Sequence, residues 1–255
     1  MSTAAINPKG ATQFKPADRP SAWLSTYLGS TVGQKILVAL TGTILVTFVV
    51  FHMIGNLKMF SGRDSINAYA YFLKHGLGAL IWVARGGLLA AFLLHLFLTI
   101  RLKIKATAAR PVGYYKMKSA QASPAATSML WTGLVVGGFV VYHLAHFTFG
   151  WTHEVPNGSG GFTNYLELTD AQGRHDVYAI VVAGFSVWWI SAIYLVVQLL
   201  LFVHLSHGIA SVFRTLGIVG KRFDPVAKLL GLGVAGTVLI GNYAIVIAVW
   251  AGYVR

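Results

Sequence analysis

The chain of 255 residues contains no cysteine. Disulfides, covalently attached c-type haem and iron–sulfur clusters held by cysteines of this chain are therefore excluded. Redox chemistry here would need a cofactor that is bound without a covalent link. Charged side chains are also scarce, because they make up 11% of the residues against 56% hydrophobic ones. This composition is typical of a polytopic membrane protein and not of a soluble domain.

Five hydrophobic stretches are long enough to cross a bilayer of about 30 Å as helices. We place them at residues 34–57, 77–100, 127–150, 177–207 and 227–250. The predicted fold class is an all-α membrane protein, a single domain over 1–255 in which 1–30 form a cytoplasmic N-terminal segment. We expect no signal peptide, because that segment has no short apolar core. No internal repeat is expected, and residues 64–75 predict a short amphipathic helix at the membrane surface.

The net charge of +13 is distributed unevenly. The N-terminal segment and the connections after the second and fourth stretches are basic. The connection after the third stretch instead contains four acids, Glu154, Glu167, Asp170 and Asp176. The positive-inside rule therefore predicts a multi-pass protein of the cytoplasmic membrane, with the N-terminus inside and the C-terminus outside. The excess of basic residues on the predicted cytoplasmic face has two explanations. It reflects membrane topology alone, or it also forms a docking surface for an acidic soluble partner. No nucleic-acid partner is expected.

Four helices each contain a candidate metal ligand: His52, His95, His143 and His204. An ionisable ring inside the bilayer is costly, so such residues usually mark a functional site. Because the helices alternate in direction, His52 shares the outer depth with His143 or His146. In the same way, His95 shares the inner depth with His204 or His207.

Two histidine pairs at two depths are what a helix bundle needs to hold two non-covalent b-type haems, because two neutral imidazoles fill both axial positions of the iron. A single buried histidine is more often a hydrogen-bonded core residue, so the inference depends on all four. Zinc would need three or four ligands at one depth, and no carboxylate lies inside a predicted span.

Neighbouring residues extend this candidate site. Gly55 and Gly208 lie on the helix faces of His52 and His204, where a large flat ring needs space, although ordinary helix packing also explains such glycines. Arg101 and Arg214 lie at the inner interface, where they can pair with haem propionates or with lipid phosphates.

Three segments resemble one family. They are 52–73 (HMIGNLKMFSGRDSINAYAYFL), 143–147 (HLAHF) and 204–209 (HLSHGI). Together they resemble the membrane-anchor cytochrome b subunit of succinate dehydrogenases and fumarate reductases, closest to the five-helix, di-haem b558 type. The resemblance covers roughly residues 25–250. It implies a four-helix bundle that holds two haems, with a fifth helix beside it.

The resemblance also implies a choice of ligands. The family has a glycine four residues after the last ligand, which favours His204 over His207. Its third-helix ligand follows an apolar run with an aromatic residue, which favours His143 over His146. The implied pairs are His95 with His204 on the inner side and His52 with His143 on the outer side, with His146 and His207 as neighbours of the haems or alternative ligands. Fumarate reductases of this type carry a glutamate where Phe202 stands here, so a proton path of that kind is not expected.

The implied function is electron relay between an iron–sulfur subunit and a quinone, with menaquinone expected. A flavoprotein subunit would oxidise succinate, a step of the tricarboxylic acid cycle, and both soluble subunits would sit on the cytoplasmic face. The complex can form a higher oligomer. Quinone contacts are expected at two places: Trp23, Ser30 and Lys35 near the start of the first helix, and Trp82 and Arg85 at the outer side. The alternatives are the di-haem subunit of another membrane oxidoreductase and a non-redox transporter with buried histidines.

Overall fold

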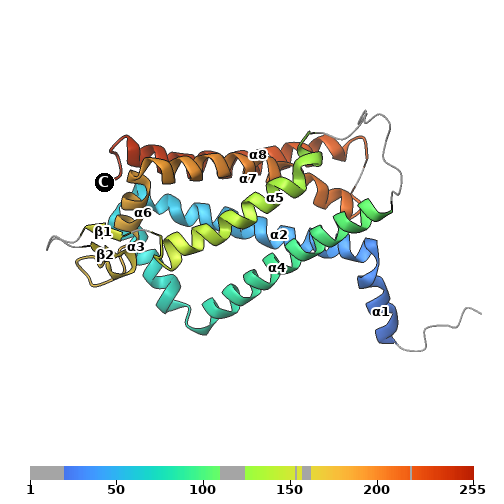
Figure 1. Cartoon of the computed structure of the whole chain (residues 1–255), viewed down its shortest axis with the longest axis horizontal. Coiled ribbons are helices and arrows are strands. Elements are labelled where there is room, and N and C mark those ends of the chain that lie inside the picture. The colour runs from blue at the N-terminus through green and yellow to red at the C-terminus, as the bar shows by residue number, and fades with distance from the viewer. Residues whose placement is uncertain (1–19, 110–123, 153, 157–161, 219) are drawn as a thin grey trace, which may run out of the picture.

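A computed structural model of the chain describes residues 20–109, 124–152, 154–156, 162–218 and 220–255. Most of the predicted N-terminal segment, residues 1–19, lies outside the described residues, as does most of the connection after the second span. The described chain is almost entirely helical (Figure 1). Five of its helices are long and apolar enough to cross a membrane, so the protein is an all-α, multi-pass membrane protein, as its composition predicts.

The elements follow in chain order as α1 (Pro20–Gly29), α2 (Thr31–Asn56), η1 (Leu57–Ser61), α3 (Arg63–Tyr71), η2 (Phe72–Gly76), α4 (Ala79–Ala108), α5 (Pro124–His143), η3 (Leu144–Thr148), β1 (Glu154–Pro156), β2 (Phe162–Asn164), η4 (Tyr165–Glu167), α6 (Val177–Ser186), α7 (Trp188–Thr215) and α8 (Phe223–Trp250). The five membrane-length helices are α2, α4, α5, α7 and α8. Strands β1 and β2 form a small antiparallel hairpin. The amphipathic segment predicted at 64–75 forms α3 and the π-helical turn η2.

The fourth predicted span, 177–207, is wrong as a single helix. Helix α6 ends at Ser186, and Val187 adopts an extended backbone conformation with φ −84° and ψ 111°. The membrane-length helix α7 then begins at Trp188 and continues to Thr215. His204 consequently lies near the middle of a long helix and not close to its end.

Side chains stabilise this break between α6 and α7. The Phe185 carbonyl accepts hydrogen bonds from Ser191 Oγ at 2.7 Å and from Trp250 Nε1 at 3.0 Å. The Phe185 carbonyl, which the end of α6 leaves without a backbone donor, thus accepts hydrogen bonds from side chains of α7 and α8. Hydropathy does not predict the break, because the residues on both sides of it are apolar.

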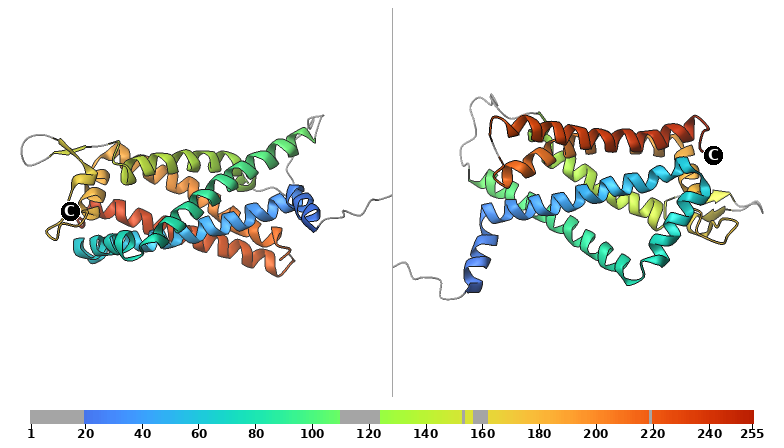
Figure 2. Two further views of the ribbon diagram at one scale, coloured as in Figure 1. Left: turned by 90° about the horizontal axis from the view of Figure 1, so that it is seen from below. Right: turned by 180° about the vertical axis from the view of Figure 1, so that it is seen from behind.

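Four of the long helices form a ring. Helix α2 packs against α4 and α7, while α5 packs against α7 and α4. Helix α2 therefore lies diagonally opposite α5, and α4 lies diagonally opposite α7. Helix α8 packs along α7 and α2 on the outside of the ring, and α1 turns away from the axis of α2 (Figure 2). This arrangement is the predicted four-helix bundle with a fifth helix.

The two ends of the bundle differ in charge. Helix α1 and the ends of α4 and α7 gather at one end, and α3, α6, the hairpin and the C-terminus gather at the other (Figure 1). The first, which we call the basic end, includes Lys35, Arg101, Lys103, Lys105, Arg214, Lys221, Arg222 and Lys228, with Asp224 as an acid. The second, which we call the acidic end, contains the five acids Asp64, Glu154, Glu167, Asp170 and Asp176 and as many bases, Lys58, Arg63, Lys74, Arg174 and Arg255.

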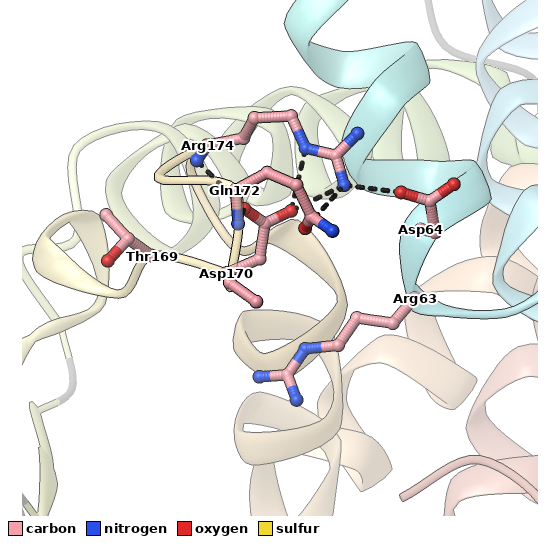
Figure 3. A pocket seen from close by; sticks show the side chains of 7 residues that line it. Arg63, Asp64, Thr169, Asp170, Gln172 and Arg174 are labelled. Carbon is pink, nitrogen blue, oxygen red and sulfur yellow. Dashed lines mark hydrogen bonds and ion pairs between the residues drawn. The ribbon is translucent and has the colours of Figure 1, made fainter.

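Ion pairs hold α3 against the connection that precedes α6. We call the group the polar latch, and its members are Arg63, Asp64, Asn67, Asp170, Arg174 and Asp176. Arg174 lies between Asp170 and Asp64, at 2.7 and 2.6 Å, beside a cavity of about 450 Å³ (Figure 3). Asp176 is buried, pairs with Arg63 and caps the start of α6 through the Ala179 amide.

Asn67 joins the two buried carboxylates of the polar latch. Its amide nitrogen lies 2.9 Å from Asp176 Oδ1 and 3.2 Å from Asp170 Oδ2. Burial alone would raise the pKa of Asp170, but hydrogen bonds from Arg174 and Asn67 outweigh it and lower that pKa to about 2. The pKa of Asp176 is also lowered, because hydrogen bonds from Arg63 and Asn67 outweigh the effect of burial.

Candidate functional site

The His95 ring of α4 rests against α2. Thr41 Oγ1 lies 3.2 Å from His95 Nδ1. The next residue is Gly42, where an added Cβ would stand only 3.2 Å from His95 Cε1. The threonine therefore contacts one ring nitrogen, and the glycine leaves space for the edge of the ring.

The His204 ring of α7 rests against α5 in the same manner. Thr132 Oγ1 lies 3.2 Å from His204 Nδ1, and a Cβ at Gly133 would stand 3.0 Å from His204 Cε1. We call the two dipeptides, Thr41–Gly42 and Thr132–Gly133, the Thr-Gly seats. Helices α4 and α7, which contain the two rings, lie diagonally opposite each other in the bundle.

Each Thr-Gly seat precedes another candidate ligand on its own helix. His52 and His143 follow the seat threonines by eleven positions each (41 to 52 and 132 to 143). Eleven residues are close to three helical turns, so each threonine and histidine share one helix face about 16 Å apart. The helices that contain them, α2 and α5, lie diagonally opposite in the bundle.

The pattern Thr-Gly-x9-His thus occurs twice in the chain. This pattern is hard to find in the sequence, because it fixes only three residues in twelve. Its two copies also lie far apart, at 41–52 and 132–143. Aligning the hydrophobic stretches on their histidines is the comparison that would have found it.

The His52 and His143 rings meet between α2 and α5. Their centroids are 5.7 Å apart and their planes are perpendicular. Two imidazoles that bind one metal atom from opposite sides have centroids about 6 Å apart, because each metal–nitrogen bond is about 2 Å and each centroid lies roughly 1 Å behind its nitrogen. The observed separation therefore suits ligation of a single metal atom by this pair.

Tyr194 of α7 connects His143 with His146. Its hydroxyl oxygen lies 3.2 Å from His143 Nδ1 and 3.0 Å from His146 Nδ1. A phenol has one proton, so it donates to one of the two rings and accepts from the other. No sequence pattern singles out Tyr194, which lies ten residues before His204 in an apolar helix.

The surroundings of the two neighbouring histidines differ. His146 is fully buried, and a Cβ at Gly184 of α6 would stand 3.1 Å from its Nε2. Helix α6 therefore closes the side of the ring from which a ligand nitrogen would bind. His143 is half-buried and contacts His52. This geometry favours His143 over His146 as the partner of His52.

Other predicted site residues have different contacts. A Cβ at Gly55 would stand 2.8 Å from the Tyr69 ring, so this glycine makes space for α3. A Cβ at Gly208 would make ordinary contact with Met129 at 3.9 Å. His207 is half-buried on α7, about one turn after His204.

The two predicted propionate partners lie at the basic end. Arg101 is exposed on α4. Arg214 lies in the last turn of α7, with its Nε 3.4 Å from Asp224 Oδ1. An arginine at the end of a membrane helix also suits the headgroup region, so the position of either residue fits both expected roles.

The residues predicted to contact quinone lie at the helix ends. Ser30 Oγ accepts a hydrogen bond from the Gly33 amide at 3.1 Å and so caps α2. Trp23 on α1 and Lys35 on α2 are exposed. On α4, the Arg85 guanidinium carbon lies 4.9 Å from the ring centroid of Trp82, and both side chains are exposed. These positions also suit anchoring side chains at a bilayer surface.

No family model, curated protein or solved structure matches this chain. In the described part of the chain, no three His, Cys, Asp or Glu side chains are grouped to hold a metal ion. The ligands that the geometry offers are therefore pairs of histidines.

Proposed function

We propose that this chain is a di-haem cytochrome b, the membrane anchor of a succinate:quinone oxidoreductase such as a succinate dehydrogenase or fumarate reductase. The observation that carries the proposal is the arrangement of four histidines as two pairs on diagonally opposite helices. The His52 and His143 rings lie side by side between α2 and α5, and His95 and His204 lie on the other diagonal pair of helices, α4 and α7, each against a Thr-Gly seat. The helical rise puts the two pairs about 16 Å apart in depth.

Pairs of imidazoles suit haem because two neutral histidine side chains would complete the ligand set of its iron. The Thr-Gly seats fit such a group, since they leave space along the edges of two of the rings. Bound haem would supply one-electron chemistry. The chain would hold the axial nitrogens at two depths, surround them with apolar helices and so keep water away.

The partners follow from charge and from the resemblance. The basic end faces the cytoplasm in this proposal, as the positive-inside rule predicts, and binds an iron–sulfur subunit through acidic residues of that subunit. A flavoprotein subunit lies beyond it and carries the succinate site. Haems held by His95 with His204 and by His52 with His143 would supply the electron relay between the iron–sulfur subunit and a quinone, with menaquinone expected. The assignment to succinate rests on the family-like segments 52–73, 143–147 and 204–209.

Single histidine variants test the haem sites. His52→Ala and His204→Ala should each reduce the haem content from two to one per chain, because each removes one axial ligand from one pair. His75→Ala is the control, since His75 is exposed and outside the membrane-length helices. Haem is counted per chain after extraction as the pyridine adduct. Loss of a haem from His207→Ala, with both retained in His204→Ala, would refute the inner assignment.

Purification of the native complex tests the succinate assignment separately. The haem-bearing chain should co-purify from its own membranes with an iron–sulfur subunit and a flavoprotein, and the complex should transfer electrons between succinate or fumarate and a quinone. Co-purification with a formate- or hydrogen-oxidising partner would retain the di-haem proposal and reject the succinate assignment. A folded chain without haem would instead favour the transporter alternative.

A further inference from the structure

We infer that Thr41 and Thr132 are positioning residues that fix the tautomers of His95 and His204, so that each ring presents an unprotonated Nε2. The inference rests on the proposed di-haem function, because Nε2 is the nitrogen that would then bind iron. It assigns a role to the Thr-Gly seats, which the expected ligand set does not include.

The proton of Thr41 is already used within α2. Thr41 Oγ1 lies 2.7 Å from the Leu37 carbonyl oxygen and 3.2 Å from that of Val38. A hydroxyl has one proton, and here it points back to the preceding helical turn. Toward His95 the oxygen can therefore only accept a hydrogen bond. His95 Nδ1 must be the donor, and a neutral imidazole with its proton on Nδ1 has a free lone pair on Nε2.

The single hydroxyl proton of Thr132 is likewise used within its own helix, α5. Its Oγ1 lies 3.1 Å from the Ser128 carbonyl oxygen and 3.2 Å from that of Met129. His204 Nδ1 is therefore also the donor, which leaves its Nε2 unprotonated.

Burial of the two threonines and the space left by the two glycines strengthen both Thr–His hydrogen bonds. Thr41 and Thr132 are each only 6% exposed, so water does not compete for their oxygens. A hydrogen bond in such surroundings is stronger than the same bond in water. Gly42 and Gly133 let the edge of each ring lie close to the helix backbone, where a Cβ would stand within 3.2 Å of Cε1. The same geometry therefore recurs in two seats on two different helices.

A hydrogen bond from Nδ1 makes an imidazole a more basic ligand and holds its orientation. A more basic ligand stabilises ferric over ferrous iron. Losing the threonine oxygen should therefore weaken haem binding and raise the midpoint potential of the inner haem. The outer haem should be unaffected, because His52 and His143 do not contact the Thr-Gly seats in this arrangement.

The test compares Thr132→Val, which removes the hydroxyl at nearly constant volume, with Thr132→Ser, which keeps it. The valine variant should bind the inner haem about 10- to 100-fold more weakly and at a higher midpoint potential, and the serine variant should restore both values. Thr43→Val is the control, because among the described residues the Thr43 hydroxyl donates to the Ala39 carbonyl of the same helix and to no histidine. Thr41→Val and Thr41→Ser should repeat the result for His95.

A second measurement requires no haem. In the haem-free protein labelled with ¹⁵N-histidine, NMR should show His204 protonated on Nδ1, and Thr132→Val should shift it toward the Nε2-protonated form. Unchanged tautomer, affinity and potential in Thr132→Val would overturn the inference and leave the di-haem proposal standing. A wild-type protein that binds no haem but shows the tautomer shift would reject the di-haem proposal and uphold the role of the threonines.

Discussion

At the scale of single residues, the histidines differ more in their hydrogen-bond partners than in their depth within the bundle. The depths of His52, His95, His143 and His204 follow from the sequence, because helix length and loop charge determine depth. Their hydrogen-bond partners do not follow from it. Thr41, Thr132 and Tyr194 contact histidines on other helices, and such contacts depend on how each helix is rotated in the bundle. Hydropathy gives no information about that rotation.

Tyr194→Phe should weaken the outer haem site about 10-fold while leaving the inner one intact. The phenylalanine keeps the ring packing but removes the hydroxyl shared by His143 and His146. In the haem-bound protein, His143 would donate from Nδ1 to this hydroxyl and keep its Nε2 free for iron, and loss of such a contact typically costs 10- to 100-fold in metal affinity. Haem titration of the haem-free protein, followed optically, measures the change.

The matched control is Tyr142→Phe. Tyr142 lies 6.2 Å from Tyr194 between ring centroids, and in the described part of the chain its hydroxyl oxygen is buried without a hydrogen-bond partner. Its removal should therefore leave both haems at wild-type affinity. Equal losses in the two variants would show that ring packing matters and that the Tyr194 hydroxyl has no specific role.

At the scale of elements, the sequence predicted four of the five membrane-length helices close to their observed positions. It predicted α6 and α7 as one continuous helix. Long apolar runs are reliable signals because they depend on composition alone. The break at Val187 instead depends on Ser191 and Trp250, whose side chains replace a backbone donor at Phe185. One of these donors comes from α8, so the break cannot be read from the local sequence.

The polar latch should give the protein a stability that is lost in acid. Folding lowers the pKa of Asp170 from 3.8 to about 2, so its ionised form favours the folded state above pH 3.8. This contribution disappears as the pH falls through the folded-state value. Thermal unfolding in detergent should therefore show a falling midpoint between about pH 4 and pH 2.

Asp170→Asn should be less stable than wild type at neutral pH and should lose less stability between pH 4 and pH 2. Glu154→Gln is the control, because Glu154 is exposed on the hairpin. Identical pH dependence in Asp170→Asn and wild type would show that this carboxylate does not contribute to acid unfolding.

At the scale of the whole molecule, charge separates the two ends of the bundle, and the order of helices in the ring sets the diagonal pairs. The charge asymmetry is visible in the sequence. The ring order is not, because the five apolar stretches give no signal of which helix contacts which. The proposed function would use both features, since two haem pairs would require diagonal helices and a cytoplasmic partner subunit would require a basic end.

The predicted orientation can be tested by labelling single cysteines, for which the natural absence of cysteine provides a clean background. Ser61→Cys, at the acidic end, should react with a membrane-impermeant maleimide in intact cells. Ala108→Cys, at the basic end, should react only after the membrane is permeabilised. Both positions are exposed. The reverse pattern would place the basic end outside and exclude it as the docking surface of a cytoplasmic subunit.

The most direct test of the central claim is the haem content of the purified wild-type protein. A dithionite-reduced minus air-oxidised spectrum, with haem quantified per chain, should show two b-type haems. One haem per chain would mean that one histidine pair has only a structural role. A folded, well-expressed chain without haem would contradict the account that the four histidines form an electron relay.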